Sequence, residues 1–126
     1  MNIYDAMVLL FALQIKHLIA DFYCQPSRWF SDKHRYISVG GSLHALVHGV
    51  LSFLVLYGFT RDLVFAFIAS AAEMVLHFHI DWIKASLGRA KRWKTDQQIY
   101  WWAFGTDQAI HHLTYLVIVV AADRYA

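Results

Sequence analysis

The segment LVFAFIASAAEMVLHFHIDW, residues 63–82, decides the fold. It is a nearly unbroken apolar run of about 20 residues, the length that an α-helix needs to cross the hydrocarbon core of a bilayer. Its second half nevertheless carries Glu73, His77 and Asp81, which are spaced four residues apart and therefore share one helix face. Such groups are costly in an apolar medium unless they meet a partner, a metal ion or water. The segment predicts a membrane-spanning helix with a polar stripe that faces the protein interior.

Three more segments have the same character: residues 3–22, 43–59 and 109–122, the last with an apolar lead-in. Hydrophobic residues make up 59% of the chain and charged residues only 16%, against about a quarter in soluble domains. We therefore expect an all-α protein, a four-helix transmembrane bundle with up-down-up-down topology. A short interfacial helix over residues 96–104 is expected before the last span, and residues 1–126 should form a single membrane-embedded domain. The alternative is a soluble helical bundle.

The distribution of basic residues indicates the orientation. The connections over residues 25–41 and 87–98 hold seven lysines and arginines, whereas the remaining connection and the termini hold Arg61 and Arg124. All five tryptophans also lie beside the two basic connections. Basic residues favour the cytoplasmic side and tryptophans favour the membrane interface. We expect a multi-pass membrane protein with these two connections in the cytoplasm and both termini outside. Asp5 takes the place of a basic start, so we expect the first segment to be retained and not cleaved as a signal peptide.

Every predicted span carries metal-type ligands at four-residue spacing. The set comprises His17, Asp21, His44, His48, Glu73, His77, Asp81, Asp107 and His111. In an up-down-up-down bundle all nine come to the cytoplasmic half of the membrane. Imidazoles and carboxylates together bind zinc, manganese and iron, and one zinc ion takes only three or four protein ligands. We therefore expect two or more divalent transition-metal ions, zinc before manganese or iron; a proton or ion pathway is the alternative.

Individual roles follow from depth. Glu73 is the deepest of the acids and the candidate catalytic base. Lys84 continues the same helix face toward the cytoplasmic interface, where its ammonium group is a candidate for catalysis and for binding a substrate phosphate; snorkelling to lipid headgroups is the alternative. Arg89 and Gln25 are the other candidate substrate-binding residues. The basic run over residues 89–94 should hold anionic lipid headgroups. Nucleic-acid binding is not expected, because no recognition fold accompanies this run.

Four motifs carry a resemblance to a known family: KHLIADFYCQ (16–25), HALVHG (44–49), EMVLHFHIDWIKASL (73–87) and DQAIHHLT (107–114). They resemble the small bacterial and phage membrane proteins called domain of unknown function 3307. The resemblance implies a four-helix protein of the bacterial inner (cytoplasmic) membrane and assigns no activity. The ligand style is also similar to that of zinc-dependent phospholipase C and of the inner-membrane metal-dependent hydrolases of the YdjM type. Those proteins use His-x3-Asp and His-x3-Glu pairs around clustered metals; His17/Asp21 and His77/Asp81 match this style, whereas His44/His48 departs from it.

Our preferred interpretation is a membrane-embedded, metal-dependent hydrolase, phosphoesterase- or phospholipase-like, that acts on a phospholipid or another lipid-linked phosphoester at the cytoplasmic interface. A metal-ion or proton transporter or channel is the first alternative, and a homo-oligomer could build its pore between subunits. A non-catalytic scaffold, held together by a fully ligated metal, is the second. Membrane lipids are the expected partners in each case.

Overall fold

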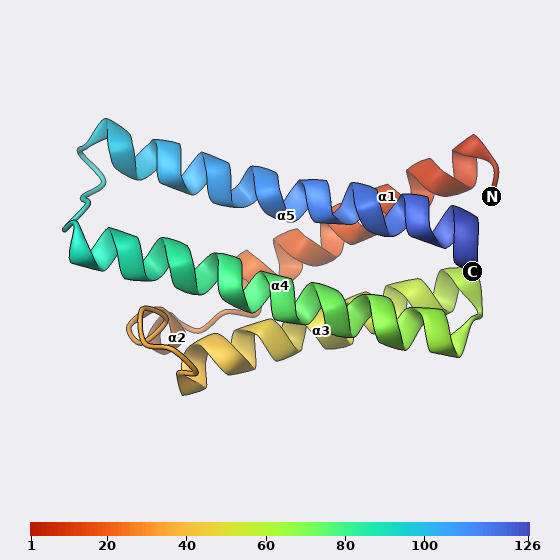
Figure 1. The fold of residues 1–126 in the computed structure, drawn as a ribbon, viewed down its shortest axis with the longest axis horizontal. Coiled ribbons are helices and arrows are strands. Elements are labelled where there is room, and N and C mark those ends of the chain that lie inside the picture. Colours follow the sequence, from red (N-terminus) through yellow and green to blue (C-terminus); the bar gives the residue numbers. More distant parts are fainter.

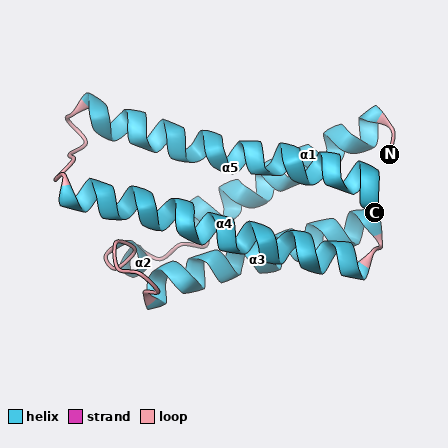
Figure 2. Ribbon diagram, in the orientation of Figure 1, coloured by secondary structure: helices cyan, strands magenta, loops and turns pink.

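The computed structural model describes residues 1–126 and contains helices and no strands. Four long helices run lengthwise: α1 (Ile3–Leu18), α3 (Val39–Thr60), α4 (Leu63–Ala90) and α5 (Gln98–Tyr125). The first of them continues into a π-helical turn, η1 (Ile19–Tyr23), and one turn of helix, α2 (Ser27–Phe30), lies in the connection that follows (Figures 1 and 2). The prediction of an all-α protein is confirmed.

The long helices pack as a ring in which α3 contacts α4, α4 contacts α5, α5 contacts α1, and α1 contacts α3. Consecutive long helices run in opposite directions, so both termini lie at the end opposite α2 and the α4–α5 connection (Figure 1). At the terminal end the Met1 amine lies 2.8 Å from Asp123 Oδ1, and this contact raises the pKa of the amine. Arg61, in the left-handed conformation, ends α3 and turns the chain directly into α4.

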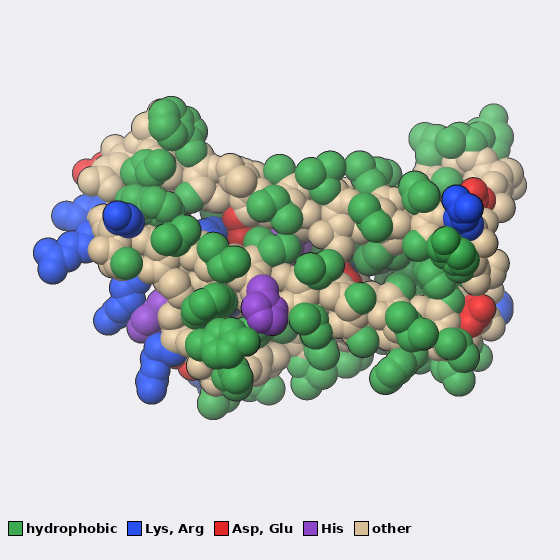
Figure 3. Space-filling model, viewed as in Figure 1, with side chains coloured by type: hydrophobic (Ala, Val, Ile, Leu, Met, Phe, Trp, Pro, Cys, Tyr) green, Lys and Arg blue, Asp and Glu red, His purple; other side chains and the backbone are tan.

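The protein buries many polar groups and exposes many apolar side chains. Half of its 26 buried residues are polar or charged, while large hydrophobic side chains are exposed on all four long helices. Figure 3 shows these side chains along the helices, and most of the visible lysines and arginines at the end that holds α2. Soluble proteins bury few charged groups. Three segments, Ile3–Tyr23, Val39–Thr60 and Leu63–Ala90, are long and apolar enough to cross a membrane.

The interior is divided along its length. Toward the termini it is an apolar core, built from Leu9, Leu13, Leu56, Ala66, Tyr115, Ile118, Val119 and Ala122. Toward α2 it consists of the histidines and acids that the sequence analysis singled out. At Gly49, between the two halves, an added Cβ would lie 3.1 Å from Met74 Cβ, so this glycine lets α3 approach α4 closely. The apolar core closes one end of the polar interior.

Two helix boundaries differ from those expected. The separate helix predicted over residues 96–104 is wrong: residues 98–104 are the first turns of α5, which continues through Gly105. Likewise α4 extends past Trp82 and through Gly88 to Ala90. A glycine inside a helix costs about 1 kcal/mol relative to alanine. That cost is too small to end a helix whose neighbouring turns are good helix formers, whereas a proline would end it.

We predict that Gly40→Ala destabilises the protein. An added Cβ would lie 2.7 Å from Trp29 Cα and 2.8 Å from its carbonyl oxygen, and this backbone cannot move aside without shifting α2. The expected loss is about 1–3 kcal/mol in the free energy of unfolding, measured in detergent. Gly58→Ala is the matched control, because nothing lies within 4 Å of its added Cβ. It should be neutral or slightly stabilising; equal losses in both variants would contradict the prediction.

Candidate metal centre

Three imidazoles and one carboxylate meet at the centre of the polar interior. They belong to Asp21, His44, His48 and His77, which each offer one ligand atom within 4.8 Å of the others. Asp21 Oδ1 lies 2.9 Å from His48 Nε2 and 3.1 Å from His44 Nε2. His44 Nε2 also lies 3.1 Å from His77 Nε2. Around a tetrahedral zinc ion, with ligand distances of about 2.0–2.1 Å, neighbouring donor atoms are about 3.3 Å apart. Three of the spacings are close to this value and a fourth, between His77 Nε2 and Asp21 Oδ1, is 4.0 Å, so the donors approach the arrangement around one such ion.

The rings themselves support this fit. His44 and His77 are fully buried, and the Nδ1 atoms of both have no hydrogen-bond partner. All their polar contacts therefore run through Nε2, the atom that faces the centre. His48 also turns its Nε2 inward, while its Nδ1 lies 3.1 Å from Lys16 Nζ. A neutral imidazole nitrogen is either a donor or an acceptor, and three Nε2 atoms that accept toward one point need a cation between them, so this convergence favours a bound cation.

A second group lies beside the first and contains His77, Asp81 and His111. Asp81 Oδ1 lies 3.3 Å from His111 Nε2, while its Oδ2 lies 3.4 Å from His44 Nε2 and 3.6 Å from His77 Nε2. The carboxylate of Asp81 therefore faces both groups with one oxygen each, the position of a bridging ligand. His77 presents the same nitrogen to both groups, so it can serve one ion at a time.

The π-helical turn places Asp21. It is closed by the hydrogen bond that Cys24 N donates to Ile19 O, 2.8 Å long, and such turns often occur at functional sites. While Asp21 Oδ1 faces α3, its Oδ2 lies 3.2 Å from His17 Nε2 on the preceding turn. His17 also contacts Gln108 through Nε2 and Tyr115 through Nδ1, at 3.1 and 2.8 Å. This ring lies outside both groups and fixes the position of Asp21.

The structure thus separates the nine predicted ligands by position. Six lie in the two candidate groups: Asp21, His44, His48, His77, Asp81 and His111. His17 and Asp107 flank them, with Asp107 Oδ1 3.5 Å from His111 Nε2. Glu73 lies one layer away, toward the apolar core. The other two histidines of these helices lie outside the groups: His79 is near the surface against Tyr36, and His112 packs beside His17.

Glu73 belongs to a buried network that the sequence analysis missed. Its Oε1 accepts a 2.7 Å hydrogen bond from Lys16 Nζ, its Oε2 accepts one from Ser52 Oγ, and Tyr115 donates to Oε1 at 3.3 Å. Lys16 and Glu73 are both almost completely buried, at 4% and 2% exposure. Because Glu73 already neutralises Lys16, the geometry favours a structural role over the predicted role of catalytic base. The sequence does indicate such a network, since Lys16 is a lone lysine inside an apolar segment and therefore needs a buried partner.

Two more lysines pair with acids at the edge of the centre. Lys33, in the connection before α3, lies 2.6 Å from Asp81 Oδ2, and this contact also escaped the sequence analysis. Lys84 lies 2.8 Å from Asp107 Oδ2. The interior thus holds four carboxylates (Asp21, Glu73, Asp81 and Asp107) against three ammonium groups (Lys16, Lys33 and Lys84). With neutral histidines, 3 − 4 leaves a net charge of −1, which favours the binding of a cation.

A cavity leads to this centre from the end that holds α2. Its volume is about 160 Å³, and its walls include Asp21 and Asp81 together with Lys33 and Lys84. The predicted substrate-binding residue Gln25 also lines it, donating to Asp21 O at 3.1 Å while its own Oε1 has no partner. A larger outer pocket of about 490 Å³ shares Lys84 with this cavity and is lined by Arg89. The three predicted substrate-binding side chains therefore lie along one path to the two acids.

A family model described as "Protein of unknown function (DUF3307)" matches residues 9–125. The chain belongs to this family. The resemblance drawn from the four sequence motifs is thereby confirmed, and the family description assigns no activity. Searches of curated proteins and of solved structures give no match. The chemistry of this DUF3307 protein has to be inferred from its own residues.

We predict that protein prepared without chelators retains roughly two equivalents of a divalent transition metal, as a paired site requires. His77→Ala should lose at least one equivalent, because His77 Nε2 takes part in both groups. His79→Ala is the matched control: it removes an imidazole from the same helix, two residues away and outside the centre. Elemental analysis of the three proteins checks this. Wild-type protein without metal, or equal metal loss in both variants, would contradict it.

We predict that Lys16→Met destabilises the protein strongly, since it leaves the buried carboxylate of Glu73 without its partner. Breaking such a pair costs about 3–5 kcal/mol. The double variant Lys16→Met/Glu73→Gln should recover most of this loss, because no buried charge remains. Unfolding free energies of the two single variants and the double variant give the coupling energy. Additive losses would show that the pair does not act as a unit.

Proposed function

We propose that the protein is a membrane-embedded, metal-dependent hydrolase that cleaves a lipid-linked phosphoester at the cytoplasmic interface. The observation that carries this proposal is the cavity beside the two donor groups. It brings two candidate metal-binding carboxylates, Asp21 and Asp81, and two ammonium groups, Lys33 and Lys84, onto one surface. Such a surface complements a phosphoester held by cations.

In this proposal all four long helices span the bacterial inner membrane. Support for α5 as the fourth span comes from its packing between α4 and α1 and from its contribution of Asp107 and His111 to the common interior. Its outer face carries exposed apolar side chains such as Val117 and Val120. At 28 residues, α4 and α5 are each about 42 Å long and project beyond a bilayer core of about 30 Å.

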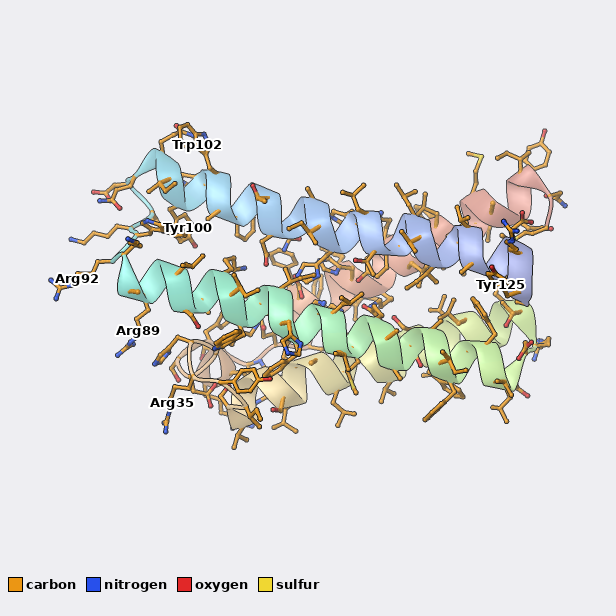
Figure 4. The ribbon with its side chains drawn as sticks, in the orientation of Figure 1. Arg35, Arg89, Arg92, Tyr100, Trp102 and Tyr125 are labelled. Carbon is orange, nitrogen blue, oxygen red and sulfur yellow. The ribbon has the colours of Figure 1, made fainter.

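The same proposal places the end that holds α2 in the cytoplasm and both termini outside. Arg35, Arg89 and Arg92 project from that end, whereas Tyr125 lies at the opposite one (Figure 4). Clustered basic residues favour the cytoplasmic side. The cavity then opens near the depth of the phospholipid headgroups, where a lipid phosphate is already present at high concentration.

Each part of the centre has a task in such a reaction. Bound divalent ions supply Lewis acidity and an activated water for displacement at phosphorus. Asp21 and Asp81 hold the centre together, because each carboxylate faces two sets of imidazoles. Lys84 and Lys33 neutralise phosphate oxygens in the cavity. Phe22, Phe30 and Phe104 line the same cavity and limit the access of bulk water.

The structure favours this function over transport. A transported ion would have to continue from the centre toward the termini. In that direction the interior offers the Lys16–Glu73–Ser52 network, in which each charge is already paired, and then the apolar core around Leu9 and Leu56. The cavity that reaches Asp21 and Asp81 also favours a hydrolase over a closed structural site.

The test is the release of a water-soluble phosphorus-labelled product, either phosphate or a phosphorylated headgroup, from a panel of radiolabelled phospholipids by protein reconstituted in vesicles. Asp81→Asn should lower the rate more than about 100-fold, beyond the 10- to 100-fold typical of residues that only orient a ligand. Arg124→Gln, which changes an exposed basic residue at the opposite end of the molecule, should keep the wild-type rate. Metal-stripped protein should regain activity with zinc or manganese. If no lipid releases a water-soluble phosphorus-labelled product while the vesicles take up the metal ion, the transporter alternative is correct.

A further inference from the structure

Two apolar grooves of similar size lie on the outer surface. One runs between α4 and α5, has a volume of about 360 Å³, and is lined by side chains such as Ile83, Trp102 and Ile110. The other runs between α3 and α4, has a volume of about 390 Å³, and is lined by side chains such as Phe53 and Phe67. In a membrane both grooves face lipid, so their apolar walls alone do not distinguish them.

The grooves differ at their inner walls. The α4–α5 groove reaches Lys84 and Asp107, which form a 2.8 Å ion pair there. In Figure 3 acidic and basic side chains are visible between these two helices. The α3–α4 groove reaches no charged group: its polar side chain is Ser70, whose hydroxyl donates to Phe67 O of the same helix. The α4–α5 groove therefore combines a long apolar surface with a buried cation.

Lys84 connects this groove to the candidate metal centre. Its side chain lines the α4–α5 groove, the 160 Å³ cavity beside Asp21 and Asp81, and the outer pocket beside Arg89. With a third of its side chain exposed, it can exchange the Asp107 carboxylate for another anion without first losing its contact with solvent. Asp107, which is itself only 2% exposed, would then keep the 3.1 Å hydrogen bond that Gln108 Nε2 donates to its Oδ2 and the 3.5 Å contact of its Oδ1 with His111 Nε2.

The length of the groove matches one leaflet. Its lining on α5 extends from Ile99 to Ile110, a rise of about 16 Å at 1.5 Å per residue. This is about half of a bilayer core of about 30 Å. Trp93 and Trp102 line the groove, and Figure 4 shows Trp102 at the end of the molecule that carries Arg89. Tryptophan at this depth is typical of the membrane interface.

From this geometry we propose that the α4–α5 groove is a lateral entrance for an anionic phospholipid, with one acyl chain along the groove and the phosphate on Lys84. The proposal rests on the hydrolase function, since it names the substrate class of the same centre: a phospholipid of the cytoplasmic leaflet that enters sideways from the bilayer. Its phosphate replaces Asp107 as the partner of Lys84 and thereby reaches the cavity beside Asp81.

The first test is photocrosslinking with a phosphonate analogue of phosphatidic acid that carries a diazirine on one acyl chain. The probe cannot be hydrolysed, and the protein is reconstituted in phosphatidylcholine vesicles. Mass spectrometry should locate the crosslinks on residues 80–87 and 99–110. A diazirine phosphatidylcholine should label these residues at least fivefold less. Labelling of the α3–α4 groove to the same extent, or no preference for the anionic probe, would overturn the proposal.

Groove-filling variants provide the second test. Ala103→Phe fills the α4–α5 groove, and Ala71→Phe fills the α3–α4 groove as its matched control. The first should lower labelling at least fivefold and the second should leave it unchanged. Lys84→Gln, which removes the ammonium group and leaves the groove open, should abolish the preference for the anionic probe. Ala103→Leu repeats the test with a smaller side chain, so that a folding defect of the phenylalanine variant does not decide the result.

The two proposals can fail separately. Specific labelling of the α4–α5 groove without hydrolysis of any lipid would refute the hydrolase function and support the groove as a lipid-binding site. Lipid hydrolysis that Ala103→Phe leaves at the wild-type rate would refute the lateral entrance and support the hydrolase function. The phosphonate probe measures binding alone, so the first outcome does not depend on catalysis.

Discussion

The fold depends on the pairing of charges inside an apolar bundle. Helices in a membrane gain little from hydrophobic contact with one another, because the lipid around them is equally apolar. Here the interior supplies directed contacts instead. Lys16 of α1 pairs with Glu73 of α4, Lys84 of α4 pairs with Asp107 of α5, and Asp21 of η1 contacts the histidines of α3. Each contact joins neighbouring or facing helices and fixes their relative height.

The candidate metal centre follows from this constraint. A carboxylate has two oxygens that can face different partners, whereas an imidazole at this centre presents one nitrogen. Asp21 and Asp81 accordingly stand between sets of histidines, with one oxygen toward each set. The histidines lie around them on α1, α3, α4 and α5. Because the two carboxylates lie between the imidazoles, the residues of this one chain can bring two cations close together without a ligand from another chain.

The periodicity of the sequence predicted this arrangement in part. Four-residue spacing identifies a shared helix face, and an alternating bundle brings those faces to one depth. The spacing does not indicate how far along the helix face the candidate metal centre extends. Glu73 lies on the same face as His77, yet four residues raise it by about 6 Å, and there it meets Lys16. Lys16 and Lys33 contact acids 57 and 48 residues away, and no local pattern encodes a pairing at such separation.

Exposure separates the charges that hold the fold from those available for function. The Lys16–Glu73 pair is sealed by the apolar core, at 4% and 2% exposure, so exchange of either partner would leave a bare charge in an apolar medium. The Lys84–Asp107 pair is chemically the same, but Lys84 is one-third exposed and lies where the cavity, the outer pocket and the α4–α5 groove meet. An anion that arrives there can reach the ammonium group from solvent, while the carboxylate of Asp107, 2% exposed, keeps its contacts with Gln108 and His111. An ion pair of one kind is therefore structural beside the apolar core and exchangeable at Lys84, and the exchangeable pair lies beside the candidate metal centre.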